Sequence, residues 1–114
     1  MTGYIFVAHD EEETVKFLQG QLHYDELEKY IIVEDDDFEY YETRLFDFIN
    51  VECNLLIDKY EEETLECNEI PKAIEIVEIL LNNSDDQKFI GFTKRLLELF
   101  TYAKENGKDV EFKF

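Results

Sequence analysis

The chain has 114 residues, of which 45% are hydrophobic, and this length suits one domain with one packed core and excludes a second. The 10 Phe and 7 Tyr residues argue against a disordered chain in spite of the net charge of −18. The first ten residues have no basic start, and no stretch reaches membrane-spanning length, so we expect a cytoplasmic protein.

The first half of the chain predicts two buried strands and two helices. Apolar runs at residues 4–8 and 30–33 are typical of buried strands. Asp10, followed by three glutamates, predicts the start of a short helix that ends near Gly20, because acidic groups are favoured at a helix N-terminus. A second helix is predicted from apolar residues at helical spacing, namely Phe38, Tyr41, Leu45, Phe48 and Ile49. Residues 38–40 would also suit a strand.

Residues 53–67 predict a β-hairpin with its turn at Tyr60. Apolar residues that alternate on both sides of this turn share one face: Cys53, Leu55, Ile57, Leu65 and Cys67. The register sets Cys53 opposite Cys67, so we expect both thiols to be close, buried and reduced. Two cysteines at this separation suit neither a disulfide scaffold nor a zinc site.

The last third of the chain predicts two helices and a closing strand. Pro71 suits the first turn of one helix, while Asp85 or Asp86 caps the next, which residues 106–107 stop. Alternation in residues 110–114 predicts a strand that joins the sheet. The predicted fold class is therefore α+β, a single domain with a mixed β-sheet, a central hairpin and about four helices packed on it.

Acidic residues are concentrated in the first part of the chain. Residues 1–70 contain 21 acidic and 4 basic side chains, a net −17, whereas residues 71–114 contain 8 and 7, a net −1. Tyrosines lie among these acids, and such a surface suits a basic protein partner, because Tyr anchors interfaces and opposite charge accelerates encounter. The predicted partner-binding residues are Asp35, Asp36, Asp37, Glu39, Tyr40, Tyr60, Glu61 and Glu62. The alternative is that Phe38 and Tyr41 are core residues and that the acids only maintain solubility.

The chain contains no motif with a catalytic or metal-binding mechanism. Residues 34–37 lack the spacing of a calcium loop and predict a solvated acidic loop. His9 and His23 belong to no nucleophile signature. Asp10 and Glu11 resemble the acidic pocket of receiver domains, but the hairpin and the small number of strands favour helix capping. We predict a non-enzymatic protein with no cofactor or metal, which contacts neither nucleic acid nor membrane directly.

The acidic composition, the Asp/Glu/Tyr clusters and the style of residues 55–61 and 70–73 resemble bacterial immunity proteins, which neutralise nuclease toxins of contact-dependent and polymorphic systems. The resemblance implies an inhibitor that covers the basic substrate cleft of a cognate toxin, with carboxylates where nucleic-acid phosphates would lie.

Two other function classes stay open. One is a nucleic-acid mimic that inhibits a DNA-binding enzyme, as anti-restriction and anti-CRISPR proteins do, and the other is a non-catalytic adaptor. A mimic should spread acidic residues along one long face, so the near-neutral last third of the chain favours the localised toxin inhibitor.

Replacing residues 35–37 by Lys is expected to slow association with the partner while the fold survives. Reversing Lys88, Lys94 and Lys104 should leave binding nearly unchanged.

Overall fold

Four antiparallel strands form one sheet in the computed structural model, which describes residues 2–114. They are β1 (Gly3–Val7), β2 (Lys29–Val33), β3 (Glu62–Leu65) and β4 (Val110–Lys113), in the order β2-β1-β4-β3. The predicted closing strand is confirmed as β4, which pairs Phe112 with Ile5 on one side and with Glu63 on the other. The sheet is antiparallel throughout instead of mixed, because the helical connections bring each strand back in the opposite direction.

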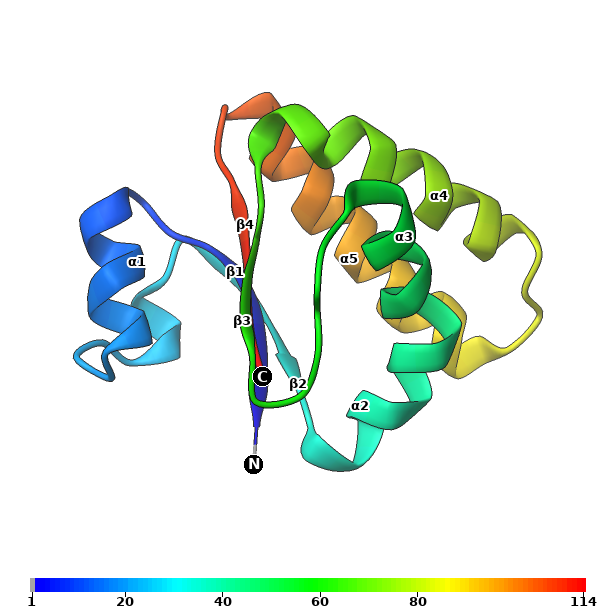
Figure 1. Cartoon of the computed structure of the whole chain (residues 1–114), viewed down its shortest axis with the longest axis horizontal. Coiled ribbons are helices and arrows are strands. Elements are labelled where there is room, and N and C mark those ends of the chain that lie inside the picture. The colour runs from blue at the N-terminus through cyan, green and yellow to red at the C-terminus, as the bar shows by residue number, and fades with distance from the viewer. Residues whose placement is uncertain (1) are drawn as a thin grey trace.

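Helices cover both faces of this sheet (Figure 1), and the α+β fold class is confirmed. One face is covered by α2 (Asp35–Tyr41), the π-helical turn η2 (Glu42–Phe46), α3 (Asp47–Cys53), α4 (Ile70–Asn82) and α5 (Gln87–Glu105). The other face is covered by α1 (Glu11–Leu18) and the 3-10 turn η1 (Tyr24–Glu26). A further 3-10 turn, η3 (Cys67–Glu69), leads into α4. Within residues 2–114 no helix is both long and apolar enough to cross a membrane.

Alternation along β1 separates two hydrophobic clusters. Ile5 and Val7 point into the main core, which the longer helices close. Phe6 points to the opposite face and packs with Phe17 and Leu27 beneath α1 and η1. The sheet therefore has a protected core on each face of its first strand.

The predicted helix boundary signals are confirmed. Asp10 caps α1 by accepting a hydrogen bond from the Glu13 amide at 2.8 Å, and Asp86 caps α5 in the same way. Pro71 lies in the first turn of α4. Gly107, with φ of +64°, follows the end of α5, where a left-handed backbone is needed.

The π-helical turn changes which residues of the acidic helical segment are buried. A π turn inserts one residue into the helical repeat and so rotates all that follows it. Phe38, Tyr41 and Leu45 are buried as predicted, and Phe46, the last residue of the turn, is fully buried. Phe48, which the regular spacing predicts as core, is 44% exposed instead. Phe38 and Tyr41 are therefore core residues and not partner contacts.

The predicted hairpin over residues 53–67 is wrong, although its turn at Tyr60 is present. Cys53 ends α3, and the extended residues 55–58 have no strand partner. Instead, Asn50 binds the backbone of Ile57 with both ends of its amide, at 3.1 and 2.8 Å. The strand β3 pairs with β4 instead, where Leu65 lies opposite Val110 and the Thr64 hydroxyl donates a hydrogen bond to Glu111 at 2.6 Å.

Candidate functional site

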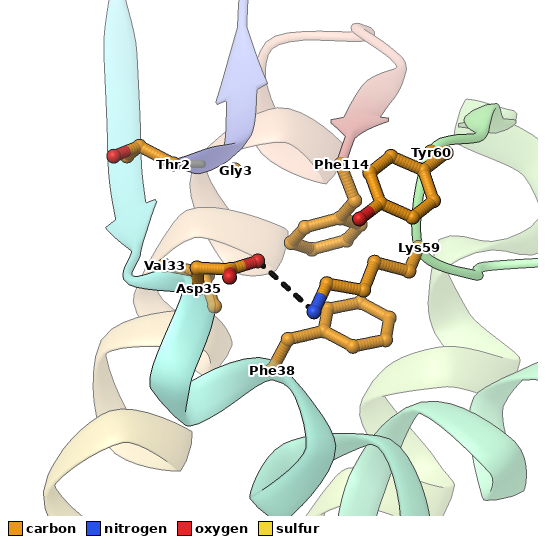
Figure 2. A pocket seen from close by; sticks show the side chains of 8 residues that line it. All are labelled: Thr2, Gly3, Val33, Asp35, Phe38, Lys59, Tyr60 and Phe114. Atoms are coloured by element: carbon orange, nitrogen blue, oxygen red, sulfur yellow. Dashed lines mark ion pairs between the residues drawn. The ribbon is translucent and has the colours of Figure 1, made fainter.

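The two predicted binding segments lie side by side, at the start of α2 and at the turn before β3. The Lys59 ammonium group contacts the Asp35 carboxylate at 3.1 Å and joins the two segments, as Figure 2 shows. The acidic run that the sequence predicts as a solvated loop is in fact the first turn of α2. The positive end of the helix dipole stabilises its carboxylates there.

Basic residues already bind part of the predicted acidic cluster. Lys88 of α5 contacts Asp37 at 2.8 Å, and Lys59 contacts Asp35. Replacing residues 35–37 by Lys would remove both ion pairs and place positive charges next to Lys59 and Lys88. The change should therefore lower the stability of the fold, contrary to the expectation from the sequence. The exposed residues Asp36 and Glu39 lie between these contacts.

The Tyr40 side chain already makes contacts with other residues of the same chain. Its hydroxyl donates a hydrogen bond to Asp86, and its ring lies 4.1 Å from the Arg44 guanidinium and 4.4 Å from the Lys88 ammonium group. Burial and the bond to Asp86 raise the pKa of Tyr40 to about 12. Of the predicted tyrosines, Tyr40 therefore links α2 to α5, whereas Tyr60 is 71% exposed.

A groove of about 340 Å³ lies between η2, α3 and the segment that leads into β3, and we call it the acidic groove. It is lined by Glu42, Asp47, Asn50, Leu56, Ile57, Asp58, Glu61, Glu62 and Glu63. Six of these residues carry carboxylates, and no basic residue of the described chain lines it. Of these residues, only Glu61 and Glu62 are predicted from the sequence to bind a partner. The incorrectly predicted hairpin pairs residues 53–58 with 62–67 and therefore does not place Glu42 and Asp47 next to this segment.

Negative charge is crowded within the acidic groove. Burial raises the pKa of the Glu42 carboxyl above its usual 4.5, and a hydrogen bond with Asp58 and the charges of Asp58 and Asp47 raise it further. One wall is held by Glu63, which accepts a hydrogen bond from the Leu56 amide at 2.8 Å. A fixed wall and mutually repelling carboxylates make this a surface that a cationic partner would stabilise.

Two other cavities are less suited to a charged partner. A cleft of about 620 Å³ beside α1 has Lys108 as well as acidic residues in its lining, and Lys108 contacts Glu28 at 2.8 Å. The pocket in Figure 2, between Phe38, Tyr60 and Phe114, has a volume of about 10 Å³, enough for roughly one water molecule. No group of three or more His, Cys, Asp or Glu side chains in residues 2–114 is arranged to hold a metal ion.

Comparison with known proteins identifies a structural neighbour. No protein-family model matches the chain, and no curated protein sequence matches it. Among solved structures, the fold is similar to that of the Neisseria DNA mimic protein DMP12, with a TM-score of 0.72 and 18% sequence identity. The match covers 100% of both chains. At this identity the likeness shows that the two proteins share a fold.

Proposed function

We propose that this protein is a nucleic-acid mimic that binds the basic surface of a DNA-binding protein and keeps DNA from it. The acidic groove carries the proposal, since six carboxylates from separate parts of the chain converge there without a basic residue of the described chain among them. The likeness over the whole chain to a protein described as a DNA mimic supports this function over the other classes. The proposed role is binding, without catalysis.

The overall charge density is close to that of the ligand to be mimicked. The molecule is 39 Å long and carries a net charge of −18, so it averages one negative charge per about 2.2 Å. Duplex DNA carries one per about 1.7 Å of its axis. A basic surface that binds DNA would therefore also be attracted electrostatically to this molecule.

The acidic part of the chain is also spread along the molecule. Residues 1–70 form α1 at the left end of Figure 1 and also α2, α3 and β3, which lie at the sheet and to its right. Of the near-neutral helices, α4 lies at the upper right of that view and α5 passes behind α3. A sequence segment that looks localised therefore extends along the longest axis, which supports the mimic over the localised inhibitor.

A toxin-immunity protein would use the same carboxylates, so the identity of the partner distinguishes the two functions. We propose to immobilise the full chain, capture proteins from a lysate of the source organism and elute with duplex DNA. The expected eluate contains a basic DNA-binding protein, because both ligands compete for one surface. A secreted nuclease as the only captured protein would favour the immunity function.

Matched charge variants test the surface itself. Glu61→Gln/Glu62→Gln removes two exposed carboxylates from the acidic groove, and Glu75→Gln/Glu78→Gln removes two from the exposed face of α4. Capture should be lost or strongly reduced with the first variant only. A partner that resists DNA, or that depends on the α4 residues, would contradict the proposed function.

A further inference from the structure

We propose that Tyr60 is an arginine-binding anchor of this surface, whose ring stacks on a guanidinium group of the basic partner while adjacent carboxylates bind its N–H groups. This inference rests on the proposed function, since it names the side chain of the partner that the acidic surface binds. Asp58, Glu61 and Glu62 are the nearby carboxylates in sequence, and all three are exposed.

The backbone of Tyr60 is unfavourable for its side chain. Its φ of +65° lies in the left-handed region, which disfavours a bulky residue and which glycine would adopt without strain. The other non-glycine residue with positive φ among residues 2–114 is Asn54, a type that tolerates this conformation. Because the Tyr60 side chain is 71% exposed, core packing does not offset the strain. A strained and exposed aromatic residue points to a role outside the folded core.

The turn that carries Tyr60 is held on both sides. Lys59 contacts Asp35 at 3.1 Å, and the Phe114 amide donates a hydrogen bond to the Glu61 carbonyl at 3.1 Å. Phe114 can take this position because its neighbour is Gly3, where a Cβ atom would lie 2.2 Å from the Phe114 ring. Figure 2 shows the Tyr60 ring at this junction, above the Lys59 side chain. A held turn fixes the position from which the ring projects, so less backbone entropy is lost when the ring binds.

Tyr40 shows within the same molecule what such a ring binds. Its ring has the Arg44 guanidinium at 4.1 Å and Lys88 at 4.4 Å, so its cation-binding capacity is used. The Tyr60 ring has Lys59 at 5.9 Å, near the ~6 Å limit of a cation–π contact. Arginine is favoured over lysine for the open ring, since a planar guanidinium can stack on the ring and still donate to neighbouring carboxylates.

Two peptides of equal charge test the inference, and they require no knowledge of the natural partner. Hexa-arginine and hexa-lysine are titrated into the full chain and into the Tyr60→Phe and Tyr60→Gly variants by isothermal calorimetry. We expect the unmodified protein and Tyr60→Phe to prefer hexa-arginine by about two- to fivefold, the range of an exposed cation–π contact. Tyr60→Gly should lose this preference and keep its affinity for hexa-lysine.

The inference fails if Tyr60→Gly retains the arginine preference, or if the unmodified protein binds neither peptide. Urea unfolding provides a second criterion: Tyr60→Gly should unfold at an equal or higher urea concentration, and a lower midpoint would show that the ring supports the fold. Capture of a DNA-displaceable partner tests the proposed function separately. A successful capture without a Tyr60-dependent preference would therefore reject the anchor alone. A Tyr60-dependent preference without a DNA-displaceable partner would reject the mimic and leave only the affinity of this surface for arginine.

Discussion

At the scale of single residues, the negative charge of Glu42 lowers the free energy of unfolding. Its pKa is raised above 4.5 by burial and by the nearby carboxylates, so the folded protein holds this proton more tightly than the unfolded chain does. The free energy of unfolding therefore decreases as pH rises from about 4.5 through the raised pKa. The acidic groove thus lowers stability at neutral pH.

The Glu42→Gln variant should relieve this cost. We expect its urea midpoint to exceed that of the unmodified protein at pH 7 and the difference to shrink at pH 4, where Glu42 is mostly protonated in both states. Glu75→Gln, on the exposed face of α4, is the control for a change of one charge. A lower midpoint for Glu42→Gln at pH 7 would show that the carboxylate stabilises the groove.

The two thiols should differ in reactivity. Both are free, and Cys53 is buried at the end of α3, where burial raises the pKa of its thiol, whereas Cys67 is half-buried in η3. Thiol labelling of the native protein should show a fast phase for Cys67 and a slow one for Cys53, since only thiolate reacts. The Cys67→Ser variant should lack the fast phase, and a fast phase that persists in it would contradict the assignment.

At the scale of elements, Asn50 takes the place of a strand partner. Its amide holds the Ile57 backbone and so fixes the segment that forms one wall of the acidic groove. Asn50→Ala should lower the free energy of unfolding by about 1–3 kcal/mol in urea titrations, because it leaves half-buried backbone groups without partners. Asn68→Ala, at an exposed position of η3, should change it little. Equal effects of the two variants would argue against this role of Asn50.

Lys88 connects the near-neutral helix α5 to the acidic turn of α2. It binds Asp37 at 2.8 Å and so differs in role from Lys94 and Lys104, although the sequence predicts that all three lysines lie away from the binding surface. Lys88→Ala should cost at most about 1 kcal/mol of stability, as expected for an exposed ion pair. It should also strengthen hexa-lysine binding more than Lys94→Ala does, since it frees a carboxylate. An equal effect of both variants would mean that only net charge matters.

At the scale of the whole molecule, the mimic differs from a localised inhibitor in how far the working surface extends. Glu11 and Glu12 lie on α1, which is at the left end of Figure 1, whereas α3 lies on the other side of the sheet. If the partner contacts the whole length of the molecule as it does DNA, Glu11→Gln/Glu12→Gln should weaken its binding and reduce the salt slope, as is also expected for Glu61→Gln/Glu62→Gln. Titrations of the captured partner between about 50 and about 200 mM salt measure both quantities. No effect of the α1 variant would limit the interface to the groove.

The sequence by itself determined the local elements. Capping at Asp10 and Asp86, the position of Pro71 and the alternation of residues 110–114 act within a few residues of one another, so β1, β2, β4 and the helices α1, α4 and α5 can be read from spacing alone. The regional acidity, and with it the expectation of a basic partner, is likewise a property of composition.

Only the tertiary structure decided which distant residues meet. Packing between segments far apart in sequence decides two features of the fold. Phe46 is buried in the core while Phe48 is exposed, because of the π-helical turn, and β3 pairs with β4. The same contacts bind Tyr40 to α5, leave Tyr60 exposed, and bring Glu42 next to Asp58. Local periodicity carries no information on such pairings, because the free energy that selects them comes from burial and from charges brought together by the whole fold.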